Sequence, residues 1–403
     1  MTMALEKQGL LSLAAGFTDN RSLPLEEVEA AVKALAEGGD NREILQYGMN
    51  QGRPDLRKLL AERFLGMEPD AGLGLDLARN CLVTNGSQQA LYLAVQVLCD
   101  AGDIVLVDRP SYFVFLEMLQ GLGVRALSLP TLADGSVDVE GLERLLDQLE
   151  AAGERRRVKA LYFVSYFSNP SSRSMSEAEK ELIAHALRRR AMLVPVIEDA
   201  AYRDLYFEKP FPARSVLSLA AWEGFPRLYL ATMTKSFATG LKIGYGFCTH
   251  EAWLARMLNI KGHQDFGSSN FGQAICQQVM ANGGFERQLT KIRAIYLRKM
   301  QVLNRSLEQG GLRELGWSWS VPTGGLYLWL QAPAGLDTRL DSQFCQRCLE
   351  AGVIYVPGDL CHGDHAPHDR VRLSFGVLGE DALQEAGSRF VGVVRGMVSA
   401  PAN

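Results

Sequence analysis

Short apolar runs alternate with amphipathic stretches through the middle of the chain. Runs such as Ile104–Val107 and Ile243–Cys248 are almost continuously apolar, which is typical of strands covered on both faces of a sheet. The intervening stretches have helical spacing, and Ser176 and Glu179 form a capping box that opens one of them. We predict strands over 81–84, 104–107, 124–129, 160–164, 193–197, 227–230 and 243–248, and helices over 87–98, 139–149 and 176–188, with another opened by Ser111.

After residue 248 the pattern changes. Long helical stretches cover 251–261 and 270–305, followed by a predicted hairpin of 317–321 and 326–330, a helix over 342–351, and strands over 353–356 and 371–374. We therefore predict an α/β protein. Its large domain, 47–304, has a mostly parallel seven-stranded sheet sandwiched by helices. A small α+β domain combines 1–46 with 305–403.

Composition narrows the class of protein. The 403 residues are 47% hydrophobic and 22% charged, with 42 Lys and Arg against 46 Asp and Glu, a net charge of −4. Because nucleic-acid affinity depends on clustered positive charge, we expect no nucleic-acid partner. No apolar run reaches the ~18 residues that a membrane span requires, and no signal peptide is recognisable. Seven cysteines form a sparse, odd set, which argues against a disulfide framework. We expect a cytoplasmic protein.

Polar residues that could carry chemistry follow several predicted strands. Lys235 lies in a hydroxyl-rich segment, and a lysine there could form a Schiff base with a carbonyl compound. Asp199 follows an apolar strand, at the edge where doubly wound folds bind ligands. Gly86 and Ser87 open a helix, whose free N–H groups suit a phosphate. Taken singly, these residues have ordinary explanations: a surface lysine, a helix N-cap and a helix start.

Three further residues complete the pattern. Tyr112 and Asn169 follow the next strands, and Arg372 lies inside a strand, where a buried guanidinium needs a partner such as a bidentate carboxylate. In this order and spacing, the six features resemble the fold-type I, class I/II aminotransferases that use pyridoxal 5′-phosphate (PLP). The subgroup most similar contains the 2-aminoadipate and kynurenine aminotransferases. The resemblance runs from about residue 12 to residue 393 and includes the tracts 46–48, 86–91 and 321–329.

The resemblance implies an enzyme that exchanges the amino group of an L-amino acid with a 2-oxo acid by a ping-pong mechanism. Lys235 would form the internal aldimine and shuttle the proton. Asp199 would pair with the pyridinium nitrogen, and Tyr202 would hydrogen-bond the phenolic oxygen. The other implied contacts are Asn169 at that oxygen, Tyr112 on the ring face, Ser87, Gln88, Thr232, Thr234 and Lys242 at the phosphate, Tyr47 at the phosphate of the other subunit of a homodimer, and Arg372, Asn169 and the backbone near Gly16 at the substrate carboxylate.

Three departures from the family pattern stand out. Lys242 replaces an arginine, which keeps the charge but loses the bidentate fork. Ser172 replaces the loop glycine after Asn169, so we expect a different turn beside the substrate. The arm over residues 1–8 is short, and Arg21 is the remaining candidate for reading a distal carboxylate, although a lone loop arginine is more often exposed.

These departures keep a second hypothesis open: elimination, replacement, cyclisation or oxidation on the same PLP scaffold, in a specialised biosynthetic pathway. A PLP-binding transcription regulator is disfavoured, because the resemblance begins too near Met1 for a DNA-binding domain of typical size.

A possible metal site needs separate consideration. Cys345, Cys348, Cys361 and His362, with His365 and His368 nearby, are zinc-ligand types. However, Cys345 and Cys348 are three residues apart on a predicted helix, whereas zinc knuckles usually lie on tight turns. We therefore expect no metal.

Overall fold

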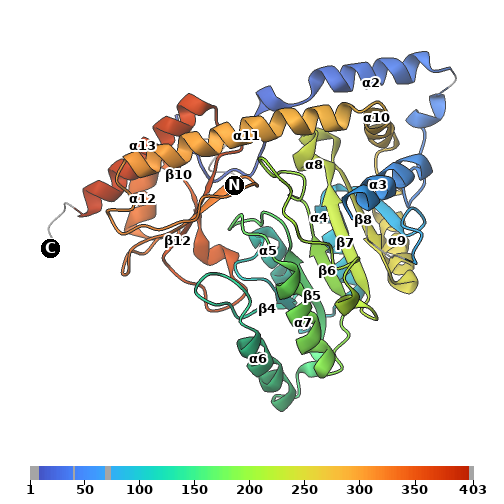
Figure 1. Ribbon diagram of the computed structural model, residues 1–403. Helices are drawn as coiled ribbons and strands as arrows, with labels where there is room; N and C mark the ends of the chain where they lie inside the picture. Colours follow the sequence, from blue (N-terminus) through green and yellow to red (C-terminus); the bar gives the residue numbers. More distant parts are fainter. Residues whose placement is uncertain (1–8, 40, 69–73, 399–403) are drawn as a thin grey trace.

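The computed structural model describes residues 9–39, 41–68 and 74–398. At its centre is a seven-stranded sheet in the order β2-β8-β7-β6-β5-β3-β4 (Figure 1). Strand β8 is antiparallel to both neighbours, and all other pairs are parallel. This confirms the predicted mostly parallel sheet. The strands are β2 (Cys81–Asn85), β3 (Ile104–Val107), β4 (Arg125–Ser128), β5 (Val158–Val164), β6 (Val196–Asp199), β7 (Arg227–Thr232) and β8 (Ile243–Cys248).

Helices cover both faces of this sheet, which explains why its strands are almost continuously apolar. On β3, Ile104 and Leu106 join a core formed with α6 (Val139–Ala151) and α7 (Glu177–Arg189). Val105 and Val107 point to the other face, into the core shared with α4 (Gly86–Leu98) and α5 (Phe113–Gly121). The predicted capping box at the start of α7 is present.

The helices beyond the sheet divide differently from the prediction. The stretch 270–305 is not one helix but two, α10 (Asn270–Ala281) and α11 (Gly284–Gln309). They separate at Gly283, whose φ of 76° is left-handed and breaks the helical path. The remaining helices are α2 (Leu25–Glu37), α3 (Pro54–Met67), α8 (Met233–Ser236), α9 (Glu251–Asp265), α12 (Gln343–Glu350) and α13 (Glu380–Val398).

A smaller sheet lies near the C-terminal helices. Its order is β11-β12-β9, all antiparallel, formed by β9 (Tyr327–Gln331), β11 (Val356–Pro357) and β12 (Arg370–Ser374). The predicted hairpin is wrong in its first half, because 317–321 contributes only an isolated bridge to β9. Trp317 instead packs on Phe344 and Phe390 of α12 and α13, and the Trp319 indole donates to Asn304 of α11.

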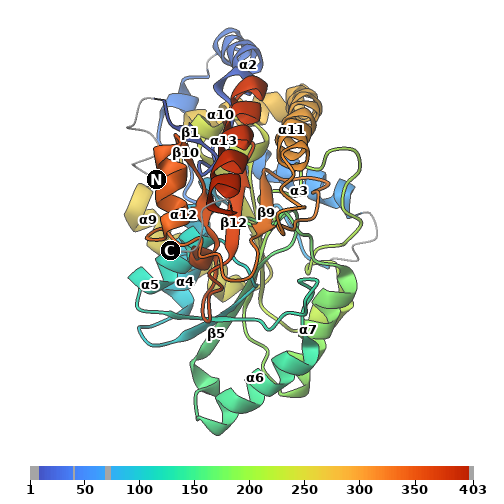
Figure 2. The same ribbon diagram turned by 90° about the vertical axis from the view of Figure 1, so that its left-hand side faces the viewer.

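The first described residues join the C-terminal part of the chain. Strand β1 (Leu11–Ser12) pairs in parallel with β10 (Val353–Ile354), as Figure 2 shows. In contrast, α2 packs against α10. The predicted domain boundary at residue 304 falls inside α11, which runs past both parts of the molecule (Figure 1). The division into 47–304 and 1–46 with 305–403 stays a prediction, and residues 1–8 of the arm lie outside the described residues.

Candidate active site

The strand ends bring most of the predicted site residues to one edge of the large sheet. Because β2, β3, β5, β6 and β7 all run in one direction, their carboxyl ends meet there, and antiparallel β8 begins there. This edge carries Ser87 and Gln88 after β2, Tyr112 after β3, Asn169 after β5, Asp199 and Tyr202 at the end of β6, Thr232, Thr234 and Lys235 at the end of β7, and Lys242 before β8.

Asp199 is a buried carboxylate at the end of β6. Its oxygens accept hydrogen bonds from the Ala201 backbone N–H at 2.9 Å and from the Tyr162 hydroxyl at 3.1 Å. No lysine or arginine of the described residues forms an ion pair with it. Burial raises the pKa of Asp199 to about 6, since the charged form lacks a cation. The site therefore offers a carboxylate that gains from a positively charged partner.

The Lys235 amine lies next to the N-terminal segment. Its Nζ donates to the carbonyl of Gly16 at 2.6 Å, so the predicted contact region near Gly16 does adjoin the lysine. Burial, and the positive charges of Arg372 and Lys242, lower the pKa of Lys235 to about 8. A much larger fraction of this amine is neutral at pH 7 than in an exposed lysine, which makes it a better nucleophile and base.

The start of α4 forms a cradle suited to an anion. Gly86 opens the helix with a φ of 70°, and its N–H donates to the Lys242 carbonyl at 2.5 Å. Gly244 lies against it, since a Cβ there would be 2.3 Å from the Gly86 carbonyl carbon. The Thr234 Oγ1 is buried near Gly86 without a hydrogen-bond partner. The Thr232 hydroxyl, in contrast, already has partners: it caps α8 and donates to the Ile243 carbonyl.

Arg372 on β12 reaches the same edge from the small sheet. It is 2% exposed. Its Nη1 donates to Asn169 Oδ1 at 2.7 Å and its Nη2 to the Ala14 carbonyl at 2.5 Å. The Nε is buried with no hydrogen-bond partner. The guanidinium also lies over the rings of Tyr327, at 4.3 Å, and Phe113, at 5.4 Å. A buried guanidinium with an unused N–H fits a carboxylate ligand.

The loop after Asn169 accommodates its serine. Ser172 has a φ of 52°, the left-handed conformation that a glycine adopts easily. Its Oγ donates to the Tyr327 carbonyl at 2.8 Å, which ties the loop to β9.

Two predicted residues lie outside this cluster. Tyr47, between α2 and α3, is 81% exposed and packs beside Phe266, itself 72% exposed. Arg21 is 74% exposed and pairs with Asp19. This exposure agrees with the solvent-facing interpretation of Arg21.

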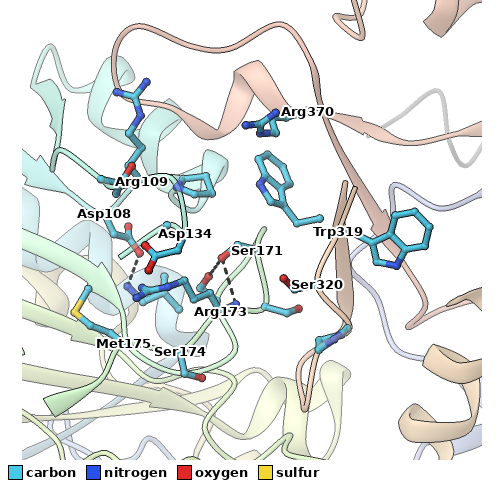
Figure 3. A pocket seen from close by; sticks show the side chains of 18 of the residues that line it. Asp108, Arg109, Asp134, Ser171, Arg173, Ser174, Met175, Trp319, Ser320 and Arg370 are labelled. Carbon is cyan, nitrogen blue, oxygen red and sulfur yellow. Dashed lines mark hydrogen bonds between the residues drawn. The ribbon is translucent and has the colours of Figure 1, made fainter. Parts of the chain in front are cut away.

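A cavity of about 780 Å³, drawn in Figure 3, has the loop residues Ser168, Ser171 and Ser172 around Asn169 in its wall. Arg109 and Arg173 line it from the large-sheet side and Arg370 from β12. Each of these arginines already forms an ion pair with a carboxylate, and the amine of Lys235 and the carboxylate of Asp199 do not line the cavity. We therefore place the candidate site at the strand edge rather than in this cavity.

The cysteines and histidines do not assemble into a site. Within residues 9–39, 41–68 and 74–398, no three His, Cys, Asp or Glu side chains lie close enough together to hold a metal ion. Cys345, Cys348 and Cys361 are buried free thiols. His362 Nδ1 is 2.9 Å from the Gly358 carbonyl, and burial lowers its pKa to about 4. For the same described residues, no helix has the length and apolar character needed to cross a bilayer.

Comparison with known proteins decides the family. The profile of "Aminotransferase class I and II" matches residues 9–390. This chain belongs to that family. The aminotransferase is 29% identical to the 2-aminoadipate transaminase of Thermus thermophilus, over 98% of this chain and 92% of that protein. It is 28% identical to aromatic-amino-acid aminotransferase 1 of Thermococcus litoralis, over 97% and 89%.

Solved structures agree. The Pyrococcus horikoshii kynurenine aminotransferase, crystallised in complex with PMP, superposes with a TM-score of 0.87 at 27% identity, over 99% of this chain and 94% of that one. The fold is therefore that of the type I PLP enzymes, and PLP is the cofactor of this aminotransferase. The predictions of family, fold, enzyme class and cofactor are confirmed.

The residues present fit PLP on independent chemical grounds. The amine of Lys235, whose pKa is lowered, can react with the aldehyde of the cofactor. Asp199 is a buried carboxylate without a cation, which suits a protonated ring nitrogen. The helix start at Gly86, with the unpartnered Thr234 hydroxyl, suits a phosphate.

Two contacts of the aminotransferase were missed at the sequence level. Tyr162 bonds Asp199, and the Tyr202 hydroxyl lies 3.0 Å from that of Tyr327. Tyr162 and Tyr327 lie inside apolar strands, where an aromatic ring is expected only to pack in the core. Only the strand register, which places Tyr162 beside Ile197 on β6, brings its hydroxyl near the end of that strand.

Proposed function

We propose that this aminotransferase transfers the amino group of L-α-amino acids with aromatic or large apolar side chains to a 2-oxo acid. The supporting observation is the environment of Arg372. Its guanidinium lies against the rings of Phe113 and Tyr327 and retains an unpaired Nε. Arg21 is exposed. The described chain thus provides one carboxylate clamp in aromatic surroundings, and the relatives include a protein named for aromatic amino acids.

The residues of the chain divide the work between them. PLP, when bound, supplies an electron sink that stabilises negative charge at the substrate α-carbon. Lys235 accepts and returns the α-proton, because burial and neighbouring positive charges lower the pKa of its amine to about 8. Asp199 keeps the ring nitrogen protonated. Arg372, with Asn169 and the backbone near Gly16, orients the α-carboxylate.

The remaining residues hold the cofactor in place. Tyr202 and Asn169 would bind its phenolic oxygen, and Tyr112 would pack on its ring. The helix start, with Ser87 and Gln88, would hold the phosphate together with Thr234 and Lys242. Thr232 supports this cradle by capping α8.

We also propose a homodimer in which Tyr47 reaches the phosphate of the other subunit. Near Tyr47, three large apolar side chains are exposed to solvent: Leu45 at 75%, Met49 at 57% and Phe266 at 72%. Burying such a patch against a second copy is favourable. The seven free thiols support a reducing compartment, the cytoplasm.

The test is the visible absorption of the PLP-loaded protein, recorded before and after addition of each member of an amino-acid panel. Aromatic and large apolar amino acids are expected to bleach the band fastest, and a 2-oxo acid to restore it. The Lys235→Ala variant is the control, and its spectrum is expected not to respond in this way. Bleaching by aspartate or glutamate alone would contradict the proposed substrate class.

A further inference from the structure

The hydroxyl groups of Tyr202 and Tyr327 form a hydrogen bond deep in the site. Their oxygens are 3.0 Å apart, and the rings meet edge to face with centroids 5.9 Å apart. Tyr202 comes from the end of β6 and Tyr327 from β9, so the bond joins the large sheet to the small one. Both residues are buried, which makes this contact costly to leave unsatisfied.

The direction of this bond follows from counting protons. A phenol has one O–H to donate and lone pairs to accept. If Tyr202 donates its proton to the phenolic oxygen of PLP, as the proposed function has it, Tyr202 can only accept from Tyr327. Tyr327 must then be the donor, and a hydroxyl that accepts one hydrogen bond becomes a stronger donor in the next.

Tyr327 is held firmly enough for this task. It is 1% exposed, and its carbonyl accepts from Ser172. Its backbone pairs with Ser374 in β12. A Cβ at Gly16 would lie 2.8 Å from its hydroxyl oxygen, so the N-terminal segment closes over that group. The hydroxyl is thereby confined to the position beside Tyr202.

We propose that Tyr327 is a positioning residue, whose hydroxyl donates to Tyr202 and strengthens the hydrogen bond from Tyr202 to the phenolic oxygen of the cofactor. This inference rests on the proposed role of Tyr202. A hydrogen bond to that oxygen withdraws electron density from it. The proton bound next to that oxygen, whose loss changes the visible absorption of the cofactor, therefore dissociates at a lower pH. Loss of the Tyr327 hydroxyl is therefore expected to raise the pH at which the band changes.

The experiment is a pH titration of the visible absorption of the holoenzyme with Tyr327→Phe, which keeps the ring over Arg372. The midpoint is expected to rise by about half to one pH unit, the equivalent of one net hydrogen bond. Tyr202→Phe is expected to raise it further, and the double variant to match Tyr202→Phe, because Tyr327 acts through Tyr202.

Tyr355→Phe is the matched control: it removes another buried phenol, bonded to Thr338, in the small sheet region. Its midpoint should equal that of the wild type. A wild-type midpoint in Tyr327→Phe, beside a shifted one in Tyr202→Phe, would overturn the inference while leaving the proposed function intact. An equal shift from Tyr327→Phe in the Tyr202→Phe background would also overturn it. An unshifted Tyr202→Phe would instead contradict the proposed role of Tyr202.

Discussion

Arg372 and Asn169, 203 residues apart in the chain, are joined by a hydrogen bond of 2.7 Å between Nη1 and Oδ1. The bond fixes one arm of the guanidinium and leaves the buried Nε free. The orientation of the clamp is thus set before a substrate carboxylate arrives, which lowers the cost of ordering it on binding.

Replacing Arg372 by lysine tests this clamp. Lysine keeps the charge but loses the planar fork, so kcat/KM for amino acids is expected to fall about 10- to 100-fold, the value of one or two charged hydrogen bonds. Single-turnover kinetics with an amino acid would measure this. The matched control is a primary amine without a carboxylate, whose rate should stay the same. An equal loss with that amine would contradict the assignment.

Lys242 should control how readily the apoenzyme takes up PLP. Because the pKa of Lys235 is about 8, its neutral fraction, and so the rate of covalent uptake, should rise with pH and level off above about 8. Lys242→Met removes one of two positive charges that lower this pKa, so the midpoint should move to higher pH. Stopped-flow absorbance measures the rate. Pyridoxal, which lacks the phosphate, should give the same shift. A wild-type midpoint near 10 would refute the argument.

Tyr162 should position Asp199 and tune its ionisation. Tyr162→Phe removes a hydrogen bond to the carboxylate, which should lower kcat roughly 5- to 10-fold, about 1 kcal/mol. Asp199 works as the anion, so activity falls as the pH drops through its pKa. The lost hydrogen bond favours the neutral acid, so the acidic limb of the kcat/KM profile should lie at higher pH than in the wild type. An identical limb in both proteins would show that Tyr162 only fills space.

At Ser172, the free energy of unfolding should reflect two opposing contributions, the strain of a left-handed backbone and one hydrogen bond. Ser172→Ala loses the bond to the Tyr327 carbonyl but keeps the left-handed backbone, so it should unfold about 1 kcal/mol more easily. Ser172→Gly loses the same bond but relaxes that backbone by a similar amount, and should be close to wild type. Urea unfolding compares the two. A glycine variant less stable than the alanine variant would contradict this account.

Tyr47 should act on the site of the other subunit. In a mixed dimer of Lys235→Ala and Tyr47→Ala chains, one site then combines a native Lys235 with a native Tyr47. Mixing the two weak variants should therefore restore up to about a quarter of wild-type activity after random exchange of subunits. The separate homodimers are the controls. No recovery, in a mixture shown to exchange, would place Tyr47 outside the shared site.

The sequence predicted most of the large sheet because burial on both faces leaves an unmistakable apolar signature. The prediction placed strand β6 at 193–197, whereas it covers Val196–Asp199 and ends on the carboxylates of Glu198 and Asp199. Both are accommodated because partners surround them. Glu198, for example, accepts from Lys180 at 2.9 Å and Ser165 at 2.6 Å.

Site residues could be predicted from the sequence where their type is unusual for a position in or next to a strand. A lysine, an aspartate and an arginine at strand ends or in a strand are conspicuous. Tyr162 and Tyr327 were not, because an aromatic ring in an apolar strand has an ordinary explanation in core packing. Each tyrosine contributes only its hydroxyl group to the site. The partner of the Tyr162 hydroxyl depends on the strand register, and that of the Tyr327 hydroxyl on the contact between the two sheets.

The pairing of β1 with β10 sets a condition on the order of synthesis. Residues 11–13 are held between Gly352, Ile354 and Ser374 by backbone hydrogen bonds, and the carbonyls of Ala14 and Gly16 follow directly. The segment that touches Arg372 and Lys235 is thus anchored by β10 and β12, which are synthesised after every strand of the large sheet. A nascent chain that has already folded its large sheet still lacks both the arginine clamp and the wall behind the lysine, so the capacity to bind an amino acid comes only after β12 has been synthesised.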